Sequence, residues 1–216
     1  MALPLGSAVG AIEKIIAGAA SVVGYRHGTE EPQHSTEELG DGVQLRRYGP
    51  RVAAETTVRA DEVAARNRGF RTLARYIFGA NHTRSAILMT APVEQQGAAR
   101  AGRQIPMTAP VAQQARGDQE WVIRFFMPSD QTLDTLPEPD DAAVRLVEVP
   151  PELIAVRRFT GSRSSRAVAT ETDRLMNTLR EFGFETTGAA AAWFYDPPWT
   201  LPLLRRNEVA VTVSAP

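Results

Sequence analysis

Side chains that commonly carry catalysis or bind metals are few among these 216 residues. Cysteine is absent, which excludes disulfides, thiolate-bound zinc, iron–sulfur clusters and cysteine nucleophiles. Of the three histidines, His27, His34 and His82, none has a second histidine three or four residues away. The sequence contains no glycine-rich phosphate loop, nucleophile elbow or HExxH motif. This inventory favours a binding module over a hydrolase or a nucleotide-dependent enzyme.

Arginine supplies nearly all of the positive charge, since Lys14 is the only lysine among 24 basic residues. Arginine suits bidentate contacts with carboxylates and phosphates, although a GC-rich genome explains the same bias. The net charge of −1 provides no overall positive field for nucleic acid. No DNA-binding helix pair is visible either, so we expect no nucleic-acid partner.

The segment 196–204 has an unusual composition, with three prolines, Trp199 and three leucines. Proline restricts the backbone, so an apolar loop of this kind is shaped in advance and loses little entropy on binding. Such a loop facing an amphipathic helix forms a slot for a flat apolar ligand. The alternative is that Trp199, Leu201 and Leu203 cover the hydrophobic core.

The elements that must position this loop indicate one α+β domain over residues 33–213. Adjacent strands with few helices favour an antiparallel sheet over βαβ units. Gly40-Asp41-Gly42 predicts a hairpin turn. One helix is expected over 61–78, ending at Gly79, and a second between an N-cap at Ser162 and Gly183. Strands are expected at 34–39, 43–48, 52–58, 121–127, 191–195 and 208–213, and a strand pair at 144–149 and 153–159.

An internal repeat suggests that the domain is duplicated. Residues 87–96 (ILMTAPVEQQ) recur at 105–114 (IPMTAPVAQQ), with eight of ten positions identical. Alternation puts Ile105, Met107, Ala109 and Val111 on one face of the second copy. Two such units related by a pseudo-two-fold axis would close a curved sheet and leave both helices outside.

Residues 1–25 are expected to form a short amphipathic helix, because Ile12, Ile15, Ile16 and Ala19 have helical spacing. This helix would pack on the domain or on a partner. Docking on a membrane surface is the alternative, although its polar face lacks basic residues. Residues 26–32 are interpreted as a linker. Without a secretory signal or a membrane span, a cytoplasmic location is expected.

Several segments, taken together in their order along the chain, resemble the SOUL/heme-binding-protein family. The most specific is Tyr195-Asp-Pro-Pro-Trp-Thr-Leu-Pro-Leu-Leu-Arg-Arg-Asn-Glu-Val209, and the resemblance covers roughly residues 30–213. Earlier matching pieces are Arg46-Arg47-Tyr48-Gly49-Pro50, Gly69-Phe70, Tyr76-Ile77-Phe78-Gly79 and Met89-Thr-Ala-Pro-Val93. The resemblance implies a distorted antiparallel β-barrel with two helices, built from a duplicated unit, and heme or another tetrapyrrole as ligand.

The resemblance also implies where heme would bind, namely against the first helix and the loop before the last strand. The ring is expected between Phe70, Ala74, Trp199 and Leu203. Arg71 and Arg75 would pair with the propionates, or form a solvated helix face instead. The full set of matching positions is Asn67, Phe70, Arg71, Ala74, Arg75, Phe78, Tyr195, Trp199, Leu201 and Leu203.

An axial iron ligand is harder to assign. Some family members carry histidine just before the tyrosine of the Arg-x-Tyr-Gly-Pro segment, but this sequence has Arg47, which stays protonated and cannot ligate iron. His82 is the best remaining histidine, or else a surface loop residue. Tyr48, Met89 and Met107 are chemically capable ligands, or else core residues.

The expected function is a soluble heme-binding or tetrapyrrole-binding protein that buffers, carries or delivers heme. A sensor or scavenger of other hydrophobic or cationic compounds is the first alternative. The implied architecture also resembles bacterial effector-binding domains that hold cationic drugs, in which an acidic group in the cavity meets the cation. Glu208 would be that group unless Arg205 or Arg206 neutralises it. The second alternative, an enzyme that releases iron or opens the ring, has little support in the residues.

Overall fold

The computed structural model describes residues 29–82, 102–197 and 199–214. The predicted helix of residues 1–25, the first repeat copy at 87–96, His27 and Met89 lie outside the described residues. Within the described part, no helix is long and apolar enough to cross a membrane.

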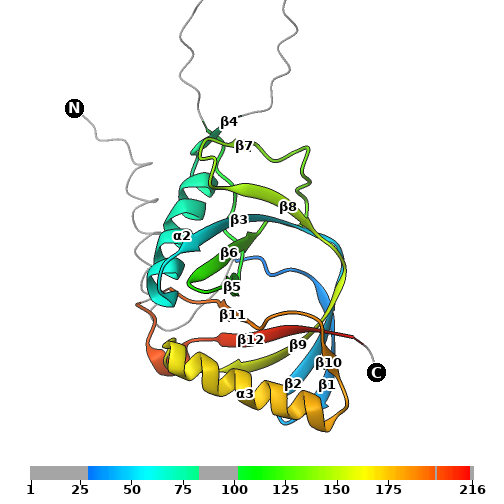
Figure 1. The fold of residues 1–216 in the computed structure, drawn as a ribbon. Helices are drawn as coiled ribbons and strands as arrows, with labels where there is room; N and C mark the ends of the chain where they lie inside the picture. Colours follow the sequence, from blue (N-terminus) through cyan, green and yellow to red (C-terminus); the bar gives the residue numbers. More distant parts are fainter. Residues whose placement is uncertain (1–28, 83–101, 198, 215–216) are drawn as a thin grey trace, which may run out of the picture.

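Two long helices and a series of strands make up the described chain (Figure 1). The helices are α2 (Glu62–Ile77) and α3 (Ser165–Glu181), and the short 3-10 helix η1 covers Pro202–Leu204. The strands are β1 (His34–Gly40), β2 (Val43–Tyr48), β3 (Arg51–Arg59), β4 (Asn81–His82), β5 (Val111–Gly117), β6 (Glu120–Phe126), β7 (Glu138–Pro139), β8 (Arg145–Val149), β9 (Glu152–Phe159), β10 (Glu185–Thr186), β11 (Ala191–Phe194) and β12 (Asn207–Ser214).

The main sheet is antiparallel, curled and duplicated. Its order is β1-β2-β9-β12-β11-β5-β6-β3-β8, which is symmetrical about the central pair β11–β5 once β1 is set aside. One half holds β3 before α2 and β5 and β6 after it, and the other half holds β9 before α3 and β11 and β12 after it. β2 and β8 are exchanged between the halves: β2 precedes β3 in the chain but pairs with β9, and β8 precedes β9 but pairs with β3. The α+β class and the duplicated antiparallel architecture are thus confirmed, with the sheet forming a half-barrel.

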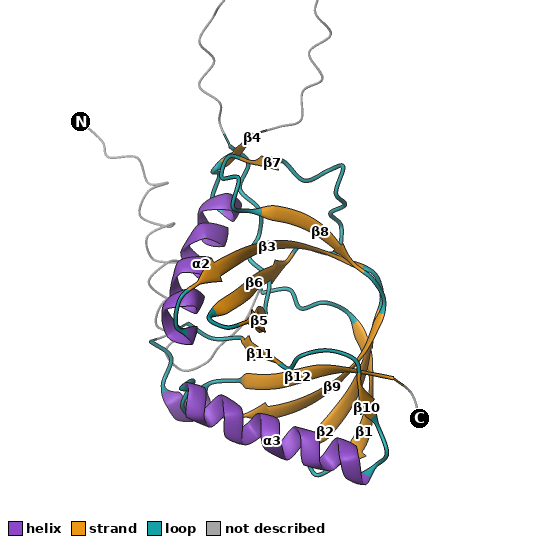
Figure 2. Cartoon of the chain, viewed as in Figure 1, coloured by secondary structure: helices purple, strands orange, loops and turns teal. Residues whose placement is uncertain are grey.

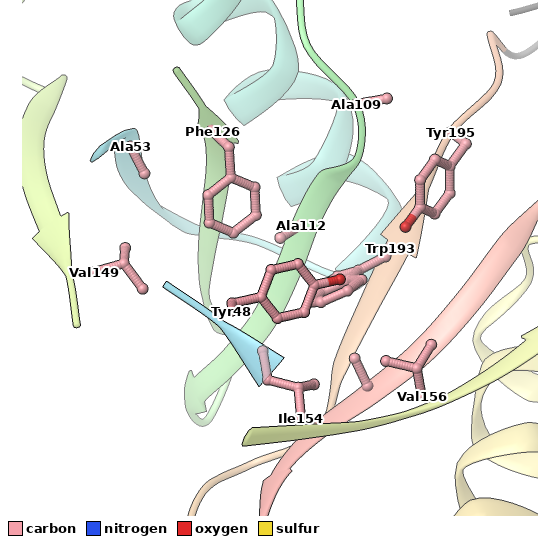
Figure 3. Packing of buried hydrophobic residues seen from close by; sticks show 11 residues of the cluster. Tyr48, Ala53, Ala109, Ala112, Phe126, Val149, Ile154, Val156, Trp193 and Tyr195 are labelled. Atoms are coloured by element: carbon pink, nitrogen blue, oxygen red, sulfur yellow. The ribbon is translucent and has the colours of Figure 1, made fainter. Parts of the chain in front are cut away.

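The two faces of the sheet carry different layers (Figure 2). On the outer face, Leu73 and Tyr76 of α2 pack on β3 and β6, while Leu175 and Leu179 of α3 pack on β9 and β12. The inner, concave face has its own apolar cluster, in which the rings of Tyr48 and Trp193 meet edge to face at 6.0 Å (Figure 3). Both helices therefore lie outside the curled sheet, as expected.

α2 approaches the sheet closely because one residue has no side chain. A Cβ on Gly69 would lie 2.3 Å from Cγ1 of the fully buried Ile123 on β6. The helix begins at Asp61, whose side chain accepts a hydrogen bond from the amide of Ala64, and ends before Gly79 at φ 111°. The helix therefore buries the side that carries Gly69, Leu73 and Tyr76, and its opposite side is left outside.

Several local expectations are wrong. Strands 144–149 and 153–159 do not pair with each other, because Pro150-Pro151 joins strands that lie in different halves of the sheet. The N-cap of α3 is Ser164, not Ser162, since Ser164 accepts the bond from Ala167. The second repeat copy becomes a strand only from Val111, so Met107 is exposed rather than on a shared face with Ile105.

Candidate functional site

The outer side of α2 presents apolar side chains to solvent. Phe70 and Phe78 have exposed fractions of 38% and 61%, and Val63 is also exposed. Phe70 keeps one contact inward, an edge-on approach of 5.4 Å to the ring of Phe125. Asn67 and Ala74 lie between these positions on the same side, so the helix carries a mixed stripe of apolar and small polar groups.

Two arginines lie beside this stripe, and they differ in whether their guanidinium groups already have a partner. Arg75 forms an exposed ion pair with Asp141 at 3.1 Å, a type of contact that contributes little to stability. Arg71 is exposed and makes no ion pair or side-chain hydrogen bond within the described part of the chain. Of the two, Arg71 is the one whose guanidinium can take a new partner without losing an existing one.

In the loop 196–204, called the Pro/Trp loop below, Trp199 and the three leucines are exposed. Trp199 is 62% exposed and Leu203 is 82% exposed, whereas Thr200 between them is fully buried. The carbonyl of Thr200 accepts a bond of 2.7 Å from Nε of Arg205. Backbone bonds from Leu204 to Leu201 and from Arg205 to Pro202 close η1. The loop is thus fixed from within, and its tips are not folded into the core.

Two arginine side chains connect α2 to the base of this loop. Arg66 of α2 donates to the carbonyl of Arg163 at 3.3 Å, and Arg163 donates to the carbonyl of Asp196 at 3.2 Å. Both guanidinium groups lie over the ring of Phe194, at 4.8 and 5.7 Å from its centroid. Burial, together with the charges of Arg66 and Arg205, lowers the pKa of Arg163 to about 10. Arg66 and Arg163 were not anticipated, because neither belongs to a recognisable motif.

Glu208 follows the loop on β12 and is fully buried among positive groups. Arg46 donates to both carboxylate oxygens at 2.8 and 3.0 Å. Arg206 donates to one of them at 2.9 Å, and the hydroxyl of Tyr195 to the other at 2.7 Å. Arg206 also binds Glu31 at 2.8 Å. The expected neutralisation by Arg206 is confirmed, and Arg46 is a second partner that the sequence did not suggest.

These contacts decide which of the buried groups are charged. Burial alone would raise the pKa of Glu208, but the bonds and charges of Arg46 and Arg206 outweigh it and lower that pKa. For Tyr195, burial and the negative charge of Glu208 raise the pKa well above its ordinary value, so its hydroxyl stays protonated and donates. Tyr195 therefore faces this charged cluster, whereas Trp199 of the same motif is exposed.

The described histidines are already engaged. Nδ1 of His82 lies 2.6 Å from Asp140, and Nε2 lies 3.4 Å from Glu138. Nδ1 of His34 lies 2.9 Å from the carbonyl of Pro32. No group of three or more histidine or acidic residues in the described ranges is arranged to hold a metal ion. His82 would have to leave a carboxylate before it could bind iron.

Two hollows lie away from the predicted site. One, of about 50 Å³, opens on the concave face among Phe126, Ile154 and Trp193, which leaves room only for water-sized molecules. The other, of about 890 Å³, is an open depression beside Pro50, Pro128 and Pro150, at the turns that join strands of the two halves. Neither is lined by the predicted residues of α2 or the Pro/Trp loop.

Comparisons with known proteins agree with this architecture. A curated relative, Heme-binding protein 2 of Homo sapiens, is 29% identical over 211 residues, covering 96% of this chain and 93% of the human protein. Among solved structures, the C-terminal domain of EcmrR matches with a TM-score of 0.56 at 9% identity, covering 85% of this chain and 99% of that one. A hydrolase from Listeria innocua matches with a TM-score of 0.51 at 13% identity, covering 79% of this chain and 91% of that one.

The solved structures establish the class, a curled antiparallel half-barrel carrying two outer helices. The family follows from the sequence itself, since the family model described as SOUL heme-binding protein matches residues 29–212. The chain belongs to the SOUL heme-binding protein family.

We predict that Glu208→Gln destabilises the fold at neutral pH. A carboxamide cannot neutralise Arg46 and Arg206, and breaking a buried ion pair costs about 3–5 kcal/mol. Because the folded-state pKa of Glu208 is lowered, the stability that its ionisation contributes is present above about pH 4.5 and is lost as the pH falls further. Urea unfolding of the wild type and the variant at pH 7 and in acid measures both effects.

Glu148→Gln, at an exposed carboxylate on β8, is the matched control and should leave the unfolding free energy within about 0.5 kcal/mol. The account of the buried network would be wrong if Glu208→Gln and Glu148→Gln unfolded at the same urea concentration.

Proposed function

We propose that this protein binds heme or a related tetrapyrrole on its outer surface, between the exposed side of α2 and the Pro/Trp loop. Membership of the SOUL heme-binding protein family supports the ligand class. The observation that carries the location is the outward orientation of Trp199 and Leu203 on a loop whose centre, Thr200, is fully buried. An apolar surface that is fixed in this way is available to a ligand rather than to the core.

The residues fit a flat, apolar disc with acidic side chains. Phe70 and Trp199 offer aromatic surface to the ring, and Arg71 has a guanidinium that no described carboxylate occupies. The guanidinium groups of Arg66 and Arg163 donate to main-chain carbonyls and so join α2 to the base of the loop, which holds the two parts of the proposed site together. Asn67, Ala74, Phe78 and Leu201 would complete the contact surface, whereas Arg75 would first have to leave Asp141.

Binding through apolar contact suits these residues better than strong axial coordination. Both nitrogens of His82 face carboxylates, and Arg47 occupies the position where some family members have histidine. Tyr48 lies in the concave-face cluster, away from the proposed surface. Heme supplies iron redox chemistry wherever it binds. What this chain supplies is an apolar platform and a guanidinium, which suits buffering, carriage or delivery of the ligand.

The structure gives less support to a sensor of cationic compounds. Within the described residues, the carboxylate of Glu208 accepts hydrogen bonds from Arg46, Arg206 and Tyr195, so its charge is already neutralised. The concave face beside it is filled by aromatic rings (Figure 3). A bound cation would therefore have to displace two arginines from a buried carboxylate, which is a costly exchange.

We predict that Trp199→Ala weakens binding of hemin about tenfold, because it removes roughly 1–2 kcal/mol of apolar and aromatic contact. Titrating the apo-protein with hemin and following the Soret band gives the dissociation constant. Phe182→Ala, which removes another exposed apolar side chain at the carboxyl end of α3, the end opposite to the one beside the loop, should leave it unchanged. Equal affinities for the two variants, or no saturable spectral change in the wild type, would contradict the proposal.

We also predict that Arg71→Ala weakens binding of hemin about fivefold but leaves binding of its dimethyl ester unchanged. Esterification removes the ligand carboxylates that Arg71 would contact, and a charge-assisted bond of this kind contributes about 1 kcal/mol at a partly exposed site. Arg47→Ala, at an exposed arginine on β2, is the control. If Arg71→Ala weakened both ligands equally, Arg71 would not be the group that reads the propionates.

A further inference from the structure

Positive charge gathers at the base of the Pro/Trp loop. Arg66, Arg163 and Arg205 lie close enough to one another that the charges of Arg66 and Arg205 help to lower the pKa of Arg163. Arg66 and Arg163 donate to main-chain carbonyls, and neither lies within ion-pairing distance of a carboxylate in the residues that the structure describes. The nearby carboxylate of Asp196 is buried and accepts a bond from the amide of Arg206.

The start of α3 adds to this charge. The amide of Gly161, shortly before α3, donates to the carbonyl of Pro202 at 2.8 Å, which places the segment beside the loop (Figure 1). The first turn of α3 has no acidic residue, and Arg166 in that turn is exposed. The amino-terminal end of a helix is itself positive. Arg66, Arg163 and Arg205 thus lie together at the base of the Pro/Trp loop, and Arg166 follows Arg163 by three residues in the first turn of α3.

Among the described residues, Leu203 and Trp199 are the two most exposed large apolar side chains, at 82% and 62%. Leu201 and Leu204 of the same loop are 51% and 45% exposed. Tryptophan and leucine at the tip with arginine at the base is the arrangement that proteins use at the boundary between lipid and water. We propose that the Pro/Trp loop docks this protein on the surface of an anionic lipid bilayer, with the tips in the interface and the arginines at the phosphates.

A bilayer fits this surface better than a protein groove does. The loop is a projection whose backbone is already bonded internally through η1 and Thr200, so it offers no free strand edge. The docking surface shares the loop with the proposed tetrapyrrole site but stands on its own exposure and charge. An apolar ligand dissolved in the membrane would reach the protein at the point of contact.

The test uses the full chain and sedimentation with vesicles of phosphatidylcholine, with or without phosphatidylglycerol. The wild type should bind vesicles that contain phosphatidylglycerol at least tenfold more strongly than vesicles of phosphatidylcholine alone, and added salt should weaken binding to the anionic vesicles. Leu203→Ser should lower vesicle binding several-fold. Arg166→Glu should lower it about tenfold, on anionic vesicles only. Met107→Ser and Arg47→Glu, which make the same changes at other exposed sites, should behave as the wild type.

The proposal is overturned if the wild type stays in solution with both kinds of vesicle, or if Arg166→Glu and Arg47→Glu bind the anionic vesicles equally. A parallel hemin titration separates it from the proposed function. Hemin binding without vesicle binding would contradict only the proposed docking surface. Vesicle binding without hemin binding would contradict only the proposed tetrapyrrole site.

Discussion

The buried carboxylate of Glu208 lies between the guanidinium groups of Arg46 and Arg206, and these contacts fix the base of the Pro/Trp loop. It joins β2 to β12 and, through Tyr195 and Arg206, fixes the two ends of the Pro/Trp loop. The amide of Arg206 also binds Asp196, so the loop is closed at its base by charged groups rather than by apolar packing. Because the base is buried and polar, the apolar tips of the loop remain outside.

The two faces of the half-barrel are occupied by different groups. The concave face is occupied by ion pairs and by the rings of Tyr48, Phe126 and Trp193, which leave a hollow of only about 50 Å³. The outer face keeps its apolar groups exposed, because α2 packs through Gly69 and Leu73 and turns Phe70 away from most of the core. A large flat ligand is therefore expected outside the sheet, beside the helix, rather than within its curve.

Much of the fold could be predicted from local signals. Gly40-Asp41-Gly42 adopts the positive φ angles that its composition suggests, and Gly79 and Gly183 follow the two helices as expected. The exchange of β2 and β8 between the halves could not be predicted. The alternation of residues along a strand indicates its inner and outer faces, but it does not identify the strand that pairs with it. For the same reason the sequence predicts a strand pair at 144–149 and 153–159, although these strands lie in different halves of the sheet.

The candidate site was predictable only in part. The terminal motif identified the loop, but Tyr195 and Trp199 belong to the same motif and differ in burial, which composition alone cannot show. Arg46 meets Glu208 across 162 residues of sequence, a contact that no spacing rule reveals. The exposure of Phe70 depends on Gly69 facing Ile123, so the apolar pattern of the helix alone did not tell which side the sheet covers.

The central claim is that a tetrapyrrole lies on the outer surface between α2 and the Pro/Trp loop. Amide and indole NMR spectra recorded while a diamagnetic gallium protoporphyrin is added test it most directly. The account predicts that the signals of Trp199, Leu203 and Phe70 shift while those of Trp193 and Glu208 stay in place. Shifts confined to Trp193, Glu208 and their neighbours on the concave face would contradict it.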